Sequence, residues 1–399
     1  MVSATVGEAV PDDQRDIAPD SEQRVTPLEL FFDLVFVFAI TQVTQFMADD
    51  PTWAGMARGG LVLAAVWWAW VSYAWLTNTI NPEEGAARLV VFAAMGAMLV
   101  VALAIPGAFG DDALLFAIAY AVVRALHILL YAYGSKDVDI KQAAFSLAPP
   151  AAVGAALLGA AAGFDGATQG LLWVAALTVD YLGPVFGDMS RWRVSPGHFA
   201  ERHGLIVIVA LGESIVALGL GAAGIPLTSG PILAALLGVG LAAGLWWAYF
   251  DVVALVAERR LQMRQGVERN RQARDAYSYL HLPMIAGIVL LALGVKKTLA
   301  HVDDPLKLEM AAALSGGVAL YLLAHVAFRL RNTGTLSRRR VVVSLALLVL
   351  AGLGPGVAAL VQLALTAALV AGLIAYEAIR FADARDEVRH RGVATPPRR

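Results

Sequence analysis

Apolar residues along this chain gather into blocks of roughly 20, and short polar segments separate the blocks. A helix of that length rises about 30 Å, which is the thickness of the hydrocarbon core of a bilayer. The pattern therefore predicts an all-α polytopic membrane protein with about 12 transmembrane helices. We expect these helices at residues 27–48, 59–80, 87–106, 112–134, 143–163, 168–187, 204–222, 230–256, 276–295, 308–330, 340–354 and 357–380.

Proline and glycine mark two places where the helical pattern is interrupted. Gly354-Pro355-Gly356 splits the last long apolar run, and we expect a tight turn there because neither residue type continues a helix well. Pro149-Pro150 lies inside the predicted fifth helix, where close packing and a broken helix are both open.

Three short similarities, which keep their order and fall on equivalent predicted helices, indicate an internal repeat. They pair Leu63-Ala-Ala-Val-Trp67-Trp68-Ala-Trp with Leu241-Ala-Ala-Gly-Leu-Trp246-Trp247-Ala-Tyr, Phe32-Asp33-Leu-Val-Phe-Val-Phe with Gly212-Glu213-Ser-Ile-Val-Ala-Leu, and His127 with His325. We therefore predict two six-helix halves of the same orientation, at residues 25–190 and 191–382, about an axis along the membrane normal. Residues 1–24 and 383–399 are predicted to be disordered cytoplasmic tails.

The distribution of positive charge predicts the orientation in the membrane, because Lys and Arg collect in cytoplasmic loops. With the N-terminus inside, 25 of the 30 basic residues fall in the inside tails, loops and adjoining helix ends. Four fall in outside loops, and Arg124 lies within a helix. Both termini are therefore expected in the cytoplasm, and the lipid bilayer is the first partner that the sequence implies.

Composition narrows the classes of function. Apolar residues make up 59% of the chain and charged residues 16%, whereas soluble domains carry about 25% charged residues. The net charge of −2 gives no basis for expecting a nucleic-acid partner. The absence of cysteine excludes disulfides, thiolate catalysis and cysteine-bound metal.

The common enzyme signatures are missing as well. His198 and His203 are five residues apart, without the His-Glu-x-x-His spacing that places two metal ligands on one helical face. Ser214 lacks the Gly-x-Ser-x-Gly pattern of a nucleophile elbow. We therefore expect no enzyme activity, no catalytic residues, no bound metal and no cofactor.

Ionisable residues inside the predicted spans are the candidates for function, since each costs roughly 2.5 to 3.5 kcal/mol to insert at the centre of a helix. They are Asp33, Arg124, His127, Asp180, Glu213, Asp251, His281 and His325. Asp33 and Glu213 occupy matching places in the two predicted halves, where they would flank a central pathway for an ion. The alternative, that they form structural pairs that hold helices together, stays equally open.

Arg124 and His127 are three residues apart and share one helix face. An arginine so deep in the membrane requires an acidic partner, and Asp33 or Asp180 could provide it. For His281 and His325 a local hydrogen bond between helices is the favoured interpretation.

Glu29 lies one turn before Asp33, which raises the possibility of a paired-carboxylate cation site. Thr26-Pro27-Leu28-Glu29 is also a capping box with proline at the first helical position, and capping is the favoured role. Arg202 and His203, placed before the predicted seventh helix, would add supporting charges. Asp251, near the end of the eighth helix, is interpreted as interfacial.

Residues 257–275 form a predicted loop with six arginines, which could bind anionic lipid head groups. A topology signal on a solvated helix is the favoured alternative. The tryptophans of the second helix are expected to pack against helices and lipid rather than to line a pathway. They are Trp67, Trp68, Trp70 and Trp75.

Three segments carry a resemblance to a known family. They are Thr26-Pro27-Leu28-Glu29-Leu30-Phe31-Phe32-Asp33-Leu34-Val35-Phe36-Val37, Glu201-Arg202-His203-Gly204-Leu205-Ile206-Val207 and Leu211-Gly212-Glu213-Ser214-Ile215. Together they resemble the bacterial low temperature requirement protein A family. The resemblance runs from about residue 24 to 380 and implies a multi-spanning bacterial membrane protein associated with growth in the cold.

A second, fainter similarity concerns Phe32-Asp33-Leu-Val-Phe-Val-Phe-Ala-Ile-Thr41, which is similar to the first-helix motif of a family of lysosomal and bacterial potassium or proton channels with six-helix repeats. Phe and Leu beside Asp33 depart from that motif, so ion selectivity is not carried over.

These observations favour a channel or transporter for a cation, a proton or a proton-coupled small solute, in the bacterial cytoplasmic membrane. Asp33 and Glu213 would contact the ion, and Arg124 and His127 would support them. The alternative is a membrane-state sensor or regulatory scaffold without transport, acting through the arginines at 257–275. The sequence leaves open a homo-oligomer and the identity of the ion or solute.

Overall fold

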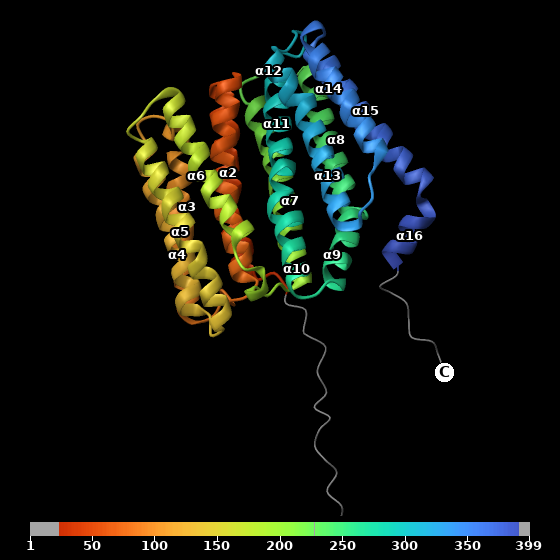
Figure 1. Cartoon of the computed structure of the whole chain (residues 1–399). Coiled ribbons are helices and arrows are strands. Elements are labelled where there is room, and N and C mark those ends of the chain that lie inside the picture. The colour runs from red at the N-terminus through yellow and green to blue at the C-terminus, as the bar shows by residue number, and fades with distance from the viewer. Residues whose placement is uncertain (1–23, 227, 391–399) are drawn as a thin grey trace, which may run out of the picture.

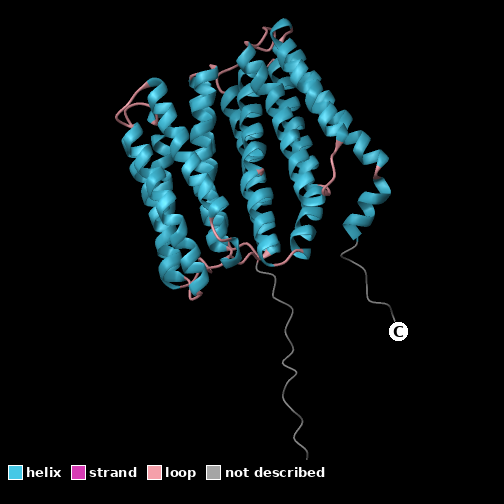
Figure 2. Ribbon diagram, in the orientation of Figure 1, coloured by secondary structure: helices cyan, strands magenta, loops and turns pink. Residues whose placement is uncertain are grey.

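The computed structural model describes residues 24–226 and 228–390, and within them the chain is almost entirely helical (Figure 2). The α-helices are α1 (Pro27–Asp49), α2 (Trp53–Thr77), α3 (Gly85–Ala104), α4 (Ala113–Gly134), α5 (Val138–Ala161), α6 (Gly166–Phe186), α7 (Pro196–Ala222), α8 (Ser229–Phe250), α9 (Val253–Met263), α10 (Gly266–Gln272), α11 (His281–Ala300), α12 (Leu308–Ala311), α13 (Gly317–Thr333), α14 (Arg338–Leu353), α15 (Ala359–Arg380) and α16 (Ala382–His390). Two π-helical stretches, Ala273–Tyr279 and Ala312–Gly316, continue α10 and α12.

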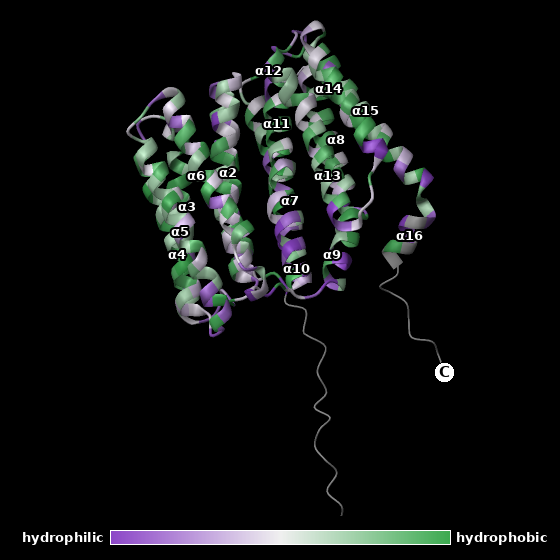
Figure 3. Ribbon diagram, in the orientation of Figure 1, coloured by the Kyte–Doolittle hydropathy of each residue, from purple (hydrophilic) through white to green (hydrophobic). Residues whose placement is uncertain are grey.

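Twelve helical segments in the described residues are long and apolar enough to cross a membrane. Three of these spans combine consecutive helices: Ser229–Met263 joins α8 to α9, Gly266–Ala300 joins α10 to α11, and Leu308–Thr333 joins α12 to α13. In Figure 3 the hydrophobic colour dominates the middle of the helices, and the hydrophilic colour gathers toward the lower ends near α7, α9 and α10. The prediction of an all-α polytopic membrane protein is confirmed.

Successive spans alternate in direction, so α1 and α7 begin on the same face of the bundle. The connecting segments 135–137, 187–195 and 264–265 lie on that face, at the lower side of Figure 1, and 334–337 leaves the lower end of α13. We call it the basic face, because most of the arginines of the described chain lie in these segments or in the adjoining helix ends. The distribution of positive charge predicts that this face is cytoplasmic.

Three predictions of local structure were wrong. Residues 257–275 are not a continuous loop but are helical on both sides of 264–265, and residues 196–203 form the first two turns of α7. Hydropathy ends a predicted helix where apolar residues stop, whereas a real helix continues into the head-group layer. Residues 383–390, predicted to be disordered, belong to α16. Of the two possibilities that the sequence left open at Pro149-Pro150, the broken helix does not occur, because α5 runs through both prolines. The other predicted tail residues, 1–23 and 391–399, lie outside the described residues.

α2 lies near the centre of the fold. In its apolar membrane-spanning stretch 83% of the residues are buried, whereas in the corresponding stretches of α5 and α6 only 28% are buried. The tryptophans of α2 bind the second half of the chain. Trp67 Nε1 donates to the Ser278 carbonyl oxygen at 2.8 Å, and Trp75 Nε1 donates to the Ser278 hydroxyl at 2.9 Å. These two side chains therefore pack in the interior and link α2 to the π-helical stretch before α11.

α11 and α13 pack against each other through glycines. A Cβ atom added at Gly317 would lie 2.9 Å from the carbonyl oxygen of Gly287 and 2.9 Å from the amide nitrogen of Leu291. A Cβ atom at Gly287 would lie 2.6 Å from the carbonyl oxygen of Gly317. Small residues let two backbones approach this closely, which is a common way for helices to associate in membranes.

Candidate functional site

A buried cluster of charges joins α1 to α7, the first helix of each predicted half. The Arg202 guanidinium group lies between two carboxylates of α1: Nη2 is 2.8 Å from Asp33 Oδ1, and Nη1 is 3.0 Å from Glu29 Oε1. His198 Nε2 lies 3.0 Å from the same Glu29 oxygen. All four side chains are at most 2% exposed, so the cluster is closed to both solvent and lipid.

The spacing of these residues explains the geometry. Glu29 and Asp33 are four apart on α1, and His198 and Arg202 are four apart on α7, so each pair lies on one helix face. The contacts Glu29–His198 and Asp33–Arg202 each join residues 169 positions apart. Two helices that begin on the same face therefore meet in register, an acidic face against a basic one.

Neutral groups complete the cluster. Trp70 Nε1 on α2 donates to Asp33 Oδ1 at 2.9 Å. The Trp70 ring centre lies 5.6 Å from the Arg202 guanidinium carbon, within the range of a cation–π interaction. The side-chain nitrogen of Asn78 lies 2.9 Å from His198 Nδ1. Each charged group is thus held by at least one further polar or aromatic partner, as a buried ion pair requires.

Glu29 and Arg202 have larger roles than the sequence predicted. The capping box between Thr26 and Glu29 is present, so the capping prediction is confirmed. The same carboxylate also pairs with Arg202, which lies inside α7 and not in a loop before it. His203, the next residue, is not part of this charge cluster. It forms a local hydrogen bond within α7, with Nδ1 2.8 Å from the Phe199 carbonyl oxygen.

Arg124 finds its acidic partner within the first half. Its Nη2 lies 2.7 Å from Asp180 Oδ1 on α6, and the Tyr120 hydroxyl donates to the other Asp180 oxygen at 3.2 Å. Arg124 also donates to the Ser72 hydroxyl. Of the two partners that the sequence left open, the structure places Asp180 there and not Asp33. His127 packs against tyrosine rings, with the Tyr131 ring centre 5.1 Å away.

The second half holds a comparable buried group that sequence reasoning missed. Arg340 Nη2 on α14 lies 2.9 Å from Glu377 Oε2 on α15, and Nη1 lies 2.7 Å from His325 Nδ1 on α13. Both charged residues are close to the ends of predicted spans, where charge is usually interfacial. A signal was present, however, because a histidine deep in the tenth span needs a partner.

Glu213 stands apart from these clusters. Its side chain is fully buried, and neither carboxylate oxygen meets a hydrogen-bond donor at ordinary geometry in the described residues. The Thr44 hydroxyl and Lys296 are its polar neighbours. Lys296 Nζ itself donates to Gln45 Oε1 at 2.5 Å.

The expectation that Asp33 and Glu213 occupy matching places is wrong. Asp33 is paired with Arg202, and Glu213 lies eleven residues further along α7, roughly 16 Å deeper at 1.5 Å per residue. The short sequence match behind that expectation is offset by about 180 positions, whereas the two helices pair at an offset of 169.

Two other predicted interpretations fit the structure. His281 makes a buried local hydrogen bond, with Nε2 2.8 Å from the Tyr249 hydroxyl. Asp251 lies at the basic-face end of α8 and pairs with Arg385 of α16 at 2.6 Å. In the described part of the chain, no group of three His, Asp or Glu side chains is placed to hold a metal ion.

The arginines at 257–275 are partly committed to contacts within the protein. Arg264 pairs with Glu268 at 2.6 Å. Arg269 Nε donates to the Arg264 carbonyl oxygen at 2.7 Å, and Arg274 Nη1 donates to the Pro184 carbonyl oxygen at 3.1 Å. The first two contacts lie within the segment, and the third ties it to the end of α6.

Comparison with known proteins agrees with this architecture. The model of the bacterial low temperature requirement A protein (LtrA) family matches residues 24–375, which include all the paired charges described above except Glu377 and Arg385. The chain is a member of the LtrA family. The match shows an LtrA membrane protein, and α1 and α7 with their ion pairs lie within it.

A relative of this LtrA protein from Rhizobium meliloti (strain 1021), described as uncharacterized protein RA0937, is 30% identical over 306 residues, which is 74% of each chain. No solved structure matches the chain. The function must therefore be argued from the site itself.

Proposed function

We propose that this LtrA protein moves a cation or a proton, or a small solute coupled to one, across the bacterial cytoplasmic membrane. The observation that carries the proposal is Glu213, a fully buried carboxylate without an aligned hydrogen-bond donor in the described residues. A buried carboxylate without an aligned hydrogen-bond donor is costly, and such residues within membrane spans commonly mark ion or proton pathways. A bound cation or proton would relieve that cost.

The surroundings of Glu213 support the same proposal. Thr44 belongs to α1, and Lys296 belongs to α11, so the carboxylate lies where the two predicted halves meet. α1 and α7 continue from there to the Asp33–Arg202 pair on the side of the basic face. In this scheme Asp33 is a gating or relay group on the path, whereas Arg124 and His127 stabilise the first half.

The first test is ion flux in proteoliposomes under imposed proton and potassium gradients. We expect Glu213→Gln to abolish flux, because the amide is nearly isosteric with the carboxylate but has no negative charge and exchanges no proton. Asp33→Asn should reduce flux and leave Arg202 paired with Glu29. The thermal stability of each variant in detergent shows whether it is still folded.

Glu201→Gln is the matched control, because it makes the same chemical change at an exposed position of the same helix. It should transport like the unmodified protein. Wild-type flux that persists unchanged in Glu213→Gln would remove this residue from the pathway. Absence of flux under every gradient would overturn transport itself and favour the membrane-sensing alternative.

A further inference from the structure

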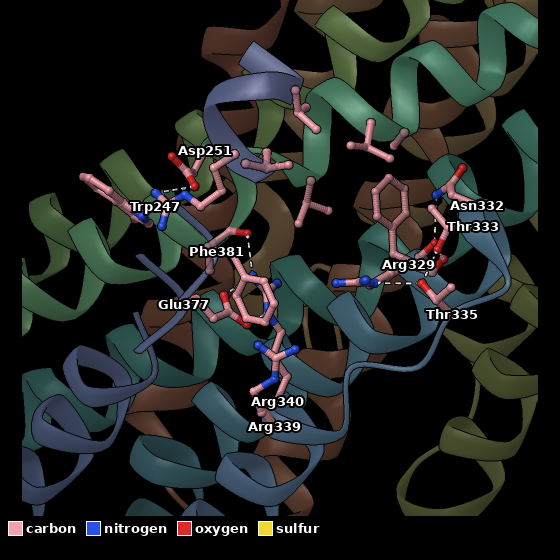
Figure 4. Close-up of a pocket in the computed structure, with 18 residues that line it drawn as sticks. Trp247, Asp251, Arg329, Asn332, Thr333, Thr335, Arg339, Arg340, Glu377 and Phe381 are labelled. Carbon is pink, nitrogen blue, oxygen red and sulfur yellow. Dashed lines mark hydrogen bonds and ion pairs between the residues drawn. The ribbon is translucent and has the colours of Figure 1, made fainter. Parts of the chain in front are cut away.

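The second half contains a pocket at the basic face that the proposed transport path does not use. It has a volume of about 310 Å³ and lies between the α8–α9 junction, α13, α14, α15 and α16 (Figure 4). Arg329 reaches in from one side, and Arg339 and Arg340 lie with Glu377 and Phe381 on the other. This volume is at the small end of the range for ligand pockets.

The charges of the pocket do not balance. Its lining includes four arginines but only two carboxylates. Arg340 pairs with Glu377 at 2.9 Å, and Arg385 pairs with Asp251 at 2.6 Å, so these two ion pairs use both acids.

Arg329 and Arg339 have no carboxylate partner in the described residues. Arg329 Nε donates to the Thr335 hydroxyl at 3.0 Å, and Arg339 lies over the Phe381 ring at 4.2 Å. Two guanidinium groups are therefore available to a negatively charged ligand. A guanidinium fork matches the oxygens of a phosphate group particularly well.

The position of the pocket points to a ligand from the membrane. It lies where α13 and α15 end and α14 begins, and we expect the ends of membrane spans at the level of the lipid head groups. Trp247 on its wall is 40% exposed, and Tyr376 and Ile379 on the neighbouring face of α15 are 51% and 81% exposed. Tryptophan and tyrosine at this level are typical of the membrane interface.

The remaining walls are largely apolar. Val252, Val256, Phe328 and Phe381 contribute to them. A free inorganic anion would gain nothing from these side chains, whereas the glycerol backbone and upper acyl chain of a lipid would cover them.

We propose that this pocket binds the phosphate head group of an anionic phospholipid, with Arg329 and Arg339 as the phosphate-binding residues. The lipid chain would leave the pocket along α14 and α15. The site is independent of the proposed transport path, and its test needs no transport.

The experiment measures lipid binding to the purified full-length protein in non-ionic detergent micelles by native mass spectrometry. Phosphatidylglycerol and phosphatidylcholine are compared as added lipids, and inorganic phosphate is added as a competitor. We expect phosphatidylglycerol to bind more tightly. Arg329→Gln combined with Arg339→Gln should weaken its binding about 25-fold, at about fivefold for each arginine near the membrane surface.

Arg259→Gln combined with Arg260→Gln is the matched control, because it removes the same charge from α9 outside the pocket lining. It should change binding less than twofold. If the double pocket variant does not fold, Arg339→Gln alone should weaken binding about fivefold. Unchanged binding in the folded pocket variant, equal weakening in the control, or complete displacement of lipid by equimolar phosphate would each overturn the proposal.

Discussion

Replacing Arg202 by methionine should destabilise the protein more than any single change at its exposed charges. The substitution leaves the Glu29 and Asp33 carboxylates buried without their shared cation. Removing one partner of a buried ion pair costs about 3–5 kcal/mol of folding stability. Denaturant titration of the purified protein in mild detergent, followed by tryptophan fluorescence, measures this loss.

Two further variants test the cause. Arg58→Met removes an arginine whose contact with Asp50 is long, at 3.9 Å, and exposed to solvent, so its effect should be below about 1 kcal/mol. Adding Glu29→Gln and Asp33→Asn to Arg202→Met removes the unpaired charges and should recover much of the stability. An Arg202→Met variant as stable as Arg58→Met would show that the cluster contributes little.

Gly317→Ala should lower the free energy of unfolding by about 1–3 kcal/mol. This loss should exceed that of most other alanine substitutions in these helices. The added methyl group would meet backbone atoms of α11 at 2.9 Å, and backbone cannot move aside as a flexible side chain can. α11 and α13 would have to separate, which would loosen the centre of the second half. The thermal unfolding midpoint in detergent reports the effect.

The neighbouring glycine provides the control. A Cβ atom at Gly316 would meet nothing within 4 Å, so Gly316→Ala should be neutral or slightly stabilising. The two variants differ by one position and contain the same new atoms. Equal midpoints for both would contradict the close packing of α11 on α13.

The helices could be predicted from sequence because a membrane span is a local property of about 20 apolar residues. The ends of the helices could not be predicted in this way. Hydropathy begins the seventh span with the apolar run that follows Arg202, so it places Arg202 outside the span. The structure instead buries it completely. Its pairing with Asp33 joins residues 169 positions apart, which no local pattern shows.

The candidate site illustrates the same limit. The need of Arg124 for an acid followed from the cost of a charge in the membrane. The choice of Asp180 depended on the way α4 and α6 both pack against α2 and α5, which brings the two side chains together. The match between Asp33 and Glu213 rested on the similar apolar residues around them, and such similarities recur easily among membrane helices. Hydrogen bonding separated the two residues: Asp33 pairs with Arg202, whereas neither Glu213 oxygen meets an aligned donor within the described residues.

The register between α1 and α7 also fixes the stoichiometry of the two halves. All the carboxylates of the cluster come from α1, and both basic groups come from α7. Two copies of the first half joined in the same way would place Glu29 and Asp33 against their own duplicates, acid facing acid. A six-helix homodimer is therefore not a substitute for this arrangement, and a single polypeptide supplies one acidic and one basic partner in a fixed ratio of one to one.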